Sequence, residues 1–318
     1  MKYTENALNI LTAKSFKNIG SQKIVDCYRK EDNIITIVNK LRRFSSDNIT
    51  VEEFEKRKNK IRNIFEKNNL SADGVVALGD KNFPQVRGDV EASKQPVCLF
   101  YKGNIELLNI NNPCVAVIGL LTPDINIEKR ETKVVSELVK KGITIVSGLA
   151  LGCDTIAHNT ALKFGGKTVA ILPSPLHNIL PKENKRLSEE IVSKGGLLIS
   201  EYYEDFSSVL ELRGRYEMRD RLQALFSNTV VLSASYAQSD KGKDSGSRLA
   251  MRDALKYNIK RAVIYNEDMD KDNPMYNLSR QVLSEKDKTI IINGKTLESS
   301  INEIANIRPN VSSQEFLF

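Results

Sequence analysis

Short apolar runs alternate regularly with longer amphipathic segments from residue 113 to about residue 266. The apolar runs lack internal polar alternation, as in 114–118, which is typical of strands covered on both faces. Further strands are predicted near 143–147, 168–172, 197–200, 229–233 and 261–265, and helices near 126–141, 154–164, 183–194, 217–226 and 247–257. This alternation implies right-handed crossovers, so the pattern predicts an α/β fold with a doubly wound, mostly parallel sheet.

The flanking segments follow other patterns. Residues 1–70 place apolar side chains at helical spacing, which predicts a small helical domain. Its turn at Ile19–Lys23 fits either a helix-hairpin-helix contact with a DNA phosphate or a plain linker within a helical cap. Short extended pieces in 71–110 are expected to lengthen one edge of the sheet of a Rossmann-like domain, 71–270. The remainder, 271–318, has a strand-like run at 289–292 and a helix near 297–306, and is too short for a full winged helix.

Composition narrows the class of protein only mildly. The 318 residues are 41% hydrophobic and 27% charged, with no apolar run of membrane-spanning length and no apolar signal region at the start, so we expect a cytoplasmic protein without membrane contact. A net charge of +7 permits an anionic partner. Four scattered cysteines without a CxxC pair, and only two histidines, argue against a zinc site or a histidine-based catalytic triad.

Small and polar residues follow each predicted strand. Gly119 comes after the first strand, Ser147-Gly148 after the second, and Ser200-Glu201 after the fourth. Ligands of an open parallel sheet sit beyond the carboxyl ends of its strands, so these loops are expected to share one ligand-binding edge. The Ser147-Gly148 turn also precedes a helix that starts at Asp154, and such a junction directs backbone N–H groups toward a phosphate.

Basic residues recur near the same edge. Lys182 opens a helix, where it either meets an anion or is an ordinary exposed lysine. Arg219 and Arg221 border the apolar stripe of the helix near 217–226 while Asp220 points away, an arrangement that fits an anion site or a structural ion pair. The next helix starts with Ser245-Gly246-Ser247-Arg248, a nest for an anion, and Arg248, Arg252 and Lys256 form either a basic ridge or a solvated face.

Catalytic patterns are missing from the sequence. There is no GxSxG elbow, Walker A loop, HExxH pair or kinase motif, and Glu201 is the one carboxylate that directly follows a predicted strand. The sequence therefore predicts a binding protein rather than an enzyme, with no cofactor and no metal.

The order of these motifs resembles the DNA-processing protein A (DprA/Smf) family. The resemblance covers about 75–265 and is carried by Gly79-Asp80-x-x-Phe83-Pro84, Ala116–Gly119, Val146–His158, Gly165–Ala170, Pro181–Asn184, Ser200–Tyr202, Arg219-x-Arg221 and Ser245–Ser247. It implies an extended Rossmann-like domain and a homodimer that binds single-stranded DNA, protects it, and loads a RecA-type recombinase during transformation in competent cells.

The resemblance also implies a set of site residues. The family's phosphate-binding edge carries over to Gly119, Gly148, Lys182, Asn184, Arg219, Arg221, Ser245 and Gly246, and the same loops add Ser147, Ser247 and Arg248.

One departure from the family pattern affects this edge. Family members usually read Gly-Ser-Arg after the first strand, whereas this chain reads Gly119-Leu120-Leu121 and so lacks one phosphate contact. Two alternatives therefore stay open. One is a nucleotide-binding sensor or nucleotide-processing enzyme, for example in a defence system, although the Pro-Gly-Gly-x-Gly-Thr signature of such enzymes is absent. The other is an interaction module whose site has decayed.

Overall fold

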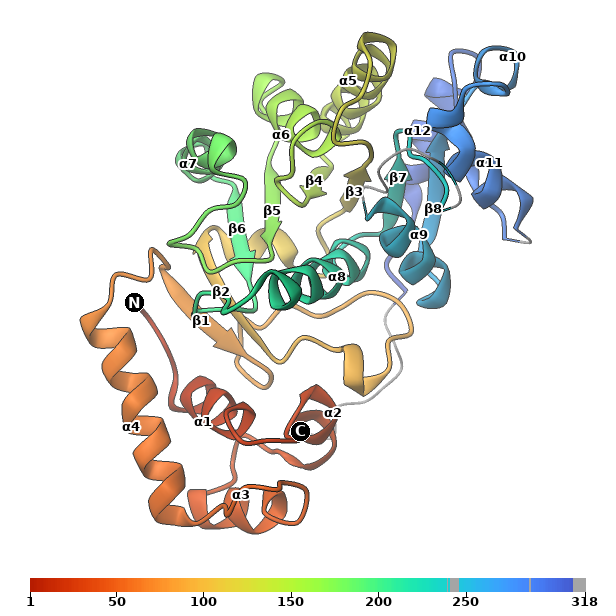
Figure 1. Ribbon diagram of the computed structural model, residues 1–318. Helices are drawn as coiled ribbons and strands as arrows, with labels where there is room; N and C mark the ends of the chain where they lie inside the picture. The colour runs from red at the N-terminus through yellow and green to blue at the C-terminus, as the bar shows by residue number, and fades with distance from the viewer. Residues whose placement is uncertain (239, 241–245, 286, 311–318) are drawn as a thin grey trace.

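Nine strands form one sheet in the order β1-β2-β6-β5-β4-β3-β7-β8-β9 (Figure 1). The computed structural model describes residues 1–238, 240, 246–285 and 287–310. Seven strands run parallel: β3 (Cys114–Ile118), β4 (Thr144–Ser147), β5 (Thr168–Leu172), β6 (Leu197–Ser200), β7 (Thr229–Leu232), β8 (Lys260–Ile264) and β9 (Ile290–Ile292). β1 (Gly74–Ala77) and β2 (Cys98–Gly103) add an antiparallel edge beside β6. The predicted fold class is confirmed.

The strand order places a topological switch point beside β3. The chain first builds outward through β4, β5 and β6, and then returns to the other side of β3 with β7 and β8. Ala116 of β3 consequently lies between Val146 of β4 and Val230 of β7 in register. Ligands of doubly wound sheets bind where the strand order reverses, so this point locates the candidate site.

Helices cover both faces of the sheet. One face packs against α8 (Val209–Leu225) and α9 (Ser247–Lys256), which stand in front of the strands in Figure 1. The other face packs against α5 (Ile125–Lys140), α6 (Cys153–Lys163), α7 (Lys185–Ser193) and α12 (Leu297–Asn306). Successive strand residues alternate between these two cores, which explains why the strand sequences are uniformly apolar.

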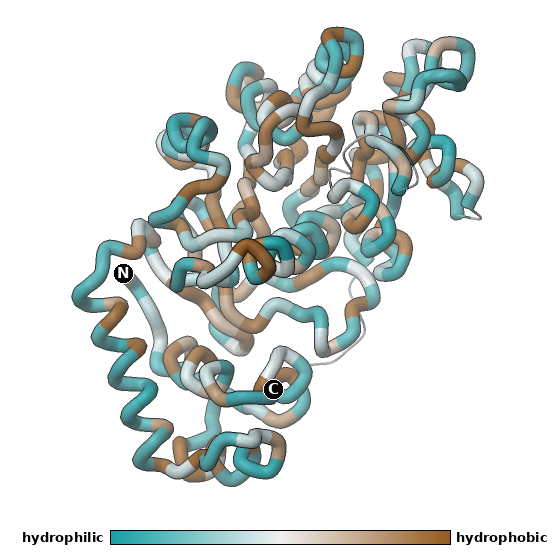
Figure 2. The backbone as a smooth tube through the Cα atoms, viewed as in Figure 1, coloured by the Kyte–Doolittle hydropathy of each residue, from teal (hydrophilic) through white to brown (hydrophobic). Residues whose placement is uncertain are grey.

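The N-terminal helices pack on the antiparallel edge. They are α1 (Glu5–Lys14), α2 (Ser21–Cys27), α3 (Ile34–Leu41) and α4 (Val51–Lys67). Phe65 of α4 lies edge-on to Phe100 of β2, with ring centroids 5.9 Å apart, so the two parts share one hydrophobic core. Figure 2 shows hydrophilic positions along α4 interrupted by hydrophobic ones, the pattern of a helix that is buried on one side only.

The sheet continues past residue 270, where the sequence placed the end of the main domain. α10 (Glu267–Asp270) and α11 (Asn277–Ser284) precede β9, which pairs in parallel with β8, and α12 packs against α5. Among the described residues, no helix is both long and apolar enough to cross a membrane. The thiols of Cys98, Cys114 and Cys153 are buried and that of Cys27 is partly exposed.

The predicted start of α8, near residue 217, is wrong, because this helix begins eight residues earlier, at Val209. Ser208 accepts a hydrogen bond from the backbone N–H of Glu211 (3.1 Å), and the carboxylate of Glu211 accepts one from the backbone N–H of Ser207 (2.9 Å). This reciprocal arrangement is close to a capping box, in which a serine is followed three residues later by a glutamate. The Ser-x-x-Glu signal was present in the sequence and marks the helix start.

Glu131 of α5 is a buried acid in the core of the sheet domain. Its side chain is 0% exposed and lies beside Cys153 and Ser233. Burial raises the pKa of this carboxyl from 4.5 to about 8, because the charged form loses its hydration. Folding therefore keeps Glu131 protonated at pH values where the unfolded chain would release the proton.

We predict that the Glu131→Gln variant gains stability relative to the wild type as the pH rises. Because the pKa is raised, the wild type has its full stability below about pH 4.5. Its free energy of unfolding then falls by up to ~1.4 kcal/mol per pH unit as the pH rises toward 8. Glutamine does not titrate, so the variant lacks this loss. Urea unfolding at several pH values measures this difference. Glu128→Gln, on an exposed position of the same helix, is the control, and an identical pH profile for all three proteins would contradict the prediction.

Candidate nucleic-acid interface

A cleft of about 650 Å³ lies at the switch point of the sheet. The loops after β3, β4 and β5 meet α8 and the start of α9 here. Its lining contains four arginines and two acids, with tyrosine, leucine and small residues between them: Leu121, Ala150, Leu151, Pro181, Arg213, Tyr216, Glu217, Arg219, Asp220, Gly246, Arg248, Leu249 and Arg252. The cleft thus combines guanidinium groups with apolar side chains.

The turn after β4 forms the floor of this region. The backbone N–H groups of Gly148 and Ala150 both donate to Oδ2 of Asp154, at 3.0 and 3.1 Å. Asp154 lies in the first turn of α6, where a carboxylate also complements the helix dipole. The sequence suggested that these N–H groups would face a phosphate, but in this structure the carboxylate of the chain itself accepts their hydrogen bonds.

Arg219 of α8 packs directly on this turn. A Cβ atom on Gly148 would lie only 1.2 Å from Nη1 of Arg219, so the guanidinium occupies the space that any side chain at position 148 would need. Nη1 is 3.7 Å from Oδ2 of Asp154, and Nε is 3.2 Å from Oδ1 of Asp220. Arg219 is only 6% exposed, yet it belongs to the lining of the cleft. A buried cation between two acids fixes α8 against the strand ends.

Asp220 does not point away from the apolar stripe into solvent, as the helical wheel suggested. It is buried, pairs with Arg219, and would contact a Cβ atom at Gly246, so it lies where α8 meets α9. Burial raises the pKa of this carboxyl to about 7, and the charge of Arg219 only partly opposes that effect. Burial therefore favours the uncharged form of this carboxyl.

Asn184 is buried beneath the turn after β4, whereas Lys182 is exposed. Asn184 is buried, and its Nδ2 donates to the carbonyl of Leu149 (2.8 Å), to that of Ala150 (3.2 Å) and to the hydroxyl of Thr155 (2.8 Å). It therefore holds the turn after β4 in place rather than facing the cleft. Lys182 is exposed and outside the cleft lining, although the neighbouring Pro181 belongs to it.

Gly119, Ser147 and Ser247 join neighbouring strand ends to each other. A Cβ atom on Gly119 would be 2.5 Å from Sγ of Cys153, so the loop after β3 can approach α6 only with glycine there. The buried Ser147 donates to the carbonyl of Val117 (2.7 Å), and Ser247 donates to the carbonyl of Gly119 (3.2 Å). These three residues lie beneath the cleft.

The two leucines after Gly119 have separate roles. Leu120 is buried in the core, and its carbonyl accepts a hydrogen bond from Cys153 N–H (2.9 Å). Leu121 is 42% exposed and lines the cleft, as does Leu151, which is 43% exposed. The position at which the resemblance led us to expect arginine is therefore a cleft position in this chain.

Arg221 lies outside the cleft. It is 2% exposed, and its Nη1 and Nη2 donate to the two carboxylate oxygens of Glu201, at 2.8 and 2.9 Å. Its Nε donates to the carbonyl of Lys94 (2.8 Å). This bidentate pair fastens α8 to the end of β6 and to the edge segment, which is the structural ion pair that the sequence left open.

The start of α9 contributes Gly246 and Arg248 to the cleft, whereas Ser245 lies outside the described residues. Of the lining residues, only Arg219, Gly246 and Arg248 were among the predicted site residues, and those missed include Arg213, Tyr216 and Arg252. Arg213 and Tyr216 were missed because α8 was predicted to start after them. The sequence places Arg252 in a basic ridge four residues after Arg248, and this spacing is the signal for its place in the cleft.

A doubly wound sheet with an arginine-lined cleft at its switch point defines a Rossmann-like protein with a site suited to an anionic ligand. The chain belongs to the family of DNA recombination-mediator protein A, whose sequence profile matches residues 74–298.

Individual relatives agree with this assignment. The chain is 34% identical over 155 residues to Protein Smf of Synechocystis, covering 48% of this chain and 37% of that protein. It is 45% identical over 107 residues to DNA processing protein DprA of Streptococcus pneumoniae, covering 34% of this chain and 36% of that protein. The matched segments thus span a little over a third of these relatives' length.

Solved structures match over a longer stretch. DNA processing protein A from Streptococcus pneumoniae has a TM-score of 0.69 and 25% identity, covering 94% of this chain and 98% of that one. DNA processing protein A from Helicobacter pylori, described with its single-stranded DNA binding mode, has a TM-score of 0.58 and 28% identity, covering 72% of this chain and 95% of that one.

We predict that Gly148→Ala destabilises the protein by about 2 kcal/mol or more, because the new methyl group collides with the buried guanidinium of Arg219. Gly20→Ala is the matched control, since a Cβ atom there would meet nothing within 4 Å. Thermal and urea unfolding of both variants measure the effect. Equal stability of the two variants would show that Arg219 does not depend on the space above Gly148.

Proposed function

We propose that this protein binds single-stranded DNA across the switch-point cleft, protects the strand, and assists loading of a RecA-type recombinase during DNA uptake or recombination. The observation that carries the proposal is the convergence of Arg213, Arg219, Arg248 and Arg252 on one cleft. Guanidinium groups bind phosphate oxygens through two parallel hydrogen bonds, which suits a backbone that is read without regard to sequence. Membership of the family supports the partners and a homodimeric state.

The apolar part of the cleft supports a nucleic-acid strand over a bare phosphate. Leu121 and Leu151 are exposed beside the arginines, and Tyr216 lines the same cleft. Proteins that bind single strands without sequence preference combine a cationic track with side chains on which bases stack. A strand with its phosphates on the arginines and a base against this wall uses both halves of the cleft.

The proposed function is binding without a catalytic step. Glu201, the carboxylate at a strand end, is held in two hydrogen bonds by Arg221 and is 7% exposed at its side chain. Asp220 is paired with Arg219. Both carboxylates therefore have a structural partner within the chain.

A nucleotide-binding sensor or nucleotide-processing enzyme is the second candidate function. The cleft volume of about 650 Å³ is in the range of small-molecule sites, and Leu121 leaves one phosphate contact fewer than family members usually have. Calorimetry with a panel of mononucleotides tests this candidate. Saturable binding of a mononucleotide, with no gain in affinity for longer strands, would favour it over the DNA-binding proposal.

We predict that Arg213→Gln/Arg252→Gln weakens binding of single-stranded DNA and makes it less salt-dependent. Each lost phosphate contact lowers the slope of log affinity against log salt by about 0.7 for a single strand, so the double variant should lose about 1.4. Fluorescence anisotropy with an oligo-dT strand over a salt series measures both effects.

The control for this variant is Lys141→Gln/Lys163→Gln, which removes two exposed charges at the opposite end of α5 and α6. Thermal unfolding confirms that each protein is folded. If the salt slope equals that of the control, Arg213 and Arg252 do not contact the DNA. If the wild type binds no strand at all, the proposed function is rejected.

We predict that Leu121→Arg strengthens binding of single-stranded DNA several-fold at low salt and increases the salt slope by about 0.7. The reason is that position 121 faces the cleft beside the arginines and is exposed enough to accept a longer side chain. Leu121→Gln separates the added charge from the loss of apolar surface. Equal affinities for the arginine and glutamine variants would show that a phosphate does not pass this position.

A further inference from the structure

The longest helix of the N-terminal part, α4, runs along the outer side of the molecule (Figure 1). Its inner face buries Phe54, Ile61 and Phe65 against the neighbouring helices and the sheet edge. Its outer face is not covered by another described element in Figure 1. The basic residues of α4 differ between the two faces in how many acidic partners they have.

The basic residues nearest the rest of the molecule are paired with acids. Lys58 and Arg62 both contact Glu5 at the start of α1, at 2.8 and 3.1 Å. Arg57 contacts Glu53 at 2.8 Å and Asp47 at 3.4 Å. These cations therefore hold the helices of the N-terminal part together.

The outer face carries lysines with little or no such pairing. Lys56, Lys60 and Lys67 lie within about 40° of one another around the helix axis, and we call them the α4 lysine stripe. Within the described part of the chain, no ion pair involves Lys60 or Lys67, and Lys56, whose side chain is 80% exposed, only approaches Glu53 at 3.9 Å. Cations four residues apart on one face, such as Lys56 and Lys60, repel each other unless an anion lies between them.

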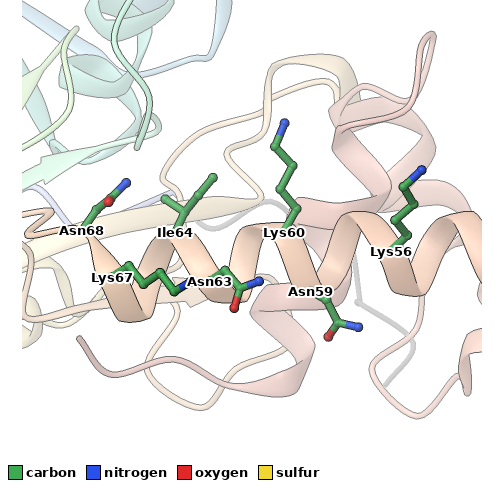
Figure 3. Close-up of a pocket in the computed structure, with 7 residues that line it drawn as sticks. All are labelled: Lys56, Asn59, Lys60, Asn63, Ile64, Lys67 and Asn68. Carbon is green, nitrogen blue, oxygen red and sulfur yellow. The ribbon is translucent and has the colours of Figure 1, made fainter.

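A shallow groove of about 520 Å³ follows the stripe. It is lined by the three lysines with Ile64 and three asparagines, and no acid takes part: Lys56, Asn59, Lys60, Asn63, Ile64, Lys67 and Asn68. Figure 3 shows Lys56 and Lys60 extending from α4 in the same direction. The groove thus offers ammonium groups with amide donors and acceptors between them.

We propose that the α4 lysine stripe is a second binding surface for the phosphate backbone of single-stranded DNA. It is occupied by strands long enough to extend beyond the cleft, so the inference rests on the proposed function of that cleft. The stripe spans about 16 Å along the helix, which is long enough to contact several consecutive phosphates of one strand. Phosphate contacts of this kind add affinity without sequence preference.

The composition of the groove favours a nucleic acid over an acidic protein segment. Protein interfaces usually have an apolar core inside a polar rim. Here Ile64 is the one apolar residue among the seven that line the groove. Asparagine amides also hydrogen-bond to phosphate and sugar oxygens, which suits a nucleic-acid backbone.

The test compares wild-type protein with Lys60→Gln/Lys67→Gln on oligo-dT strands of about 6 and about 40 nucleotides over a salt series. We expect unchanged binding of the short strand, which the cleft alone can hold. For the long strand we expect affinity several-fold lower at low salt and a salt slope smaller by about 1.4, since two single-strand phosphate contacts are lost.

The matched control is again Lys141→Gln/Lys163→Gln, which changes the net charge equally. If both variants bind the long strand alike, or if the stripe variant loses the short strand equally, the inference is overturned while DNA binding by the cleft still stands. If the wild type binds neither strand, the proposed function itself fails. Polyglutamate is added as a competitor. If polyglutamate binding depends on the stripe while binding of long DNA does not, the stripe is a site for an acidic protein and the inference is overturned.

Discussion

The contact of Asp154 with the turn after β4 is the constraint on which the switch-point architecture depends. Its carboxylate accepts hydrogen bonds from the backbone N–H groups of Gly148 and Ala150. Arg219 packs in the space that is open because residue 148 is glycine. The turn, the start of α6 and the middle of α8 are thereby fixed relative to one another. Because the backbone N–H groups are already engaged, an anion in the cleft has to be bound mainly by side chains, and the arginines of α8 and α9 are placed for that.

Arg219 and Arg221 of α8 are both buried but differ in how the chain satisfies their charge. Arg221 satisfies its guanidinium with both oxygens of Glu201 and a backbone carbonyl, an arrangement whose removal leaves a buried carboxylate without its partner. Arg219 instead shares its charge loosely between Asp154 and Asp220 at 3.7 and 3.2 Å. Burial raises the pKa of Asp220, so the charged form of this partner of Arg219 is less favoured than it would be in water.

The sequence predicted the sheet well because buried parallel strands need uniformly apolar segments, and 114–118 and 168–172 coincide with β3 and β5. It failed at the start of α8, where Val209 and Leu210 are exposed rather than packed on the core, so that the capping residues are the signal for the helix. Within the site, Arg219, Gly246 and Arg248 could be found from the sequence motifs, whereas Arg213 and Arg252 were missed. The partners of Arg221 and Asn184 could not, because Glu201 and Leu149 lie 20 and 35 residues away and meet them only through the tertiary fold.

The cleft and the α4 lysine stripe offer different kinds of contact to the single strand that we propose they bind. The cleft holds planar guanidinium groups beside apolar side chains, with one arginine almost fully buried, so its contacts are directional. The stripe consists of flexible, exposed ammonium groups, whose attraction fades beyond about 10 Å at 0.1 M salt. A strand that touches both surfaces would therefore be positioned by the cleft, while the stripe would mainly lengthen the bound segment at low ionic strength. This division would suit the proposed role, in which the protein holds a strand and leaves its bases accessible.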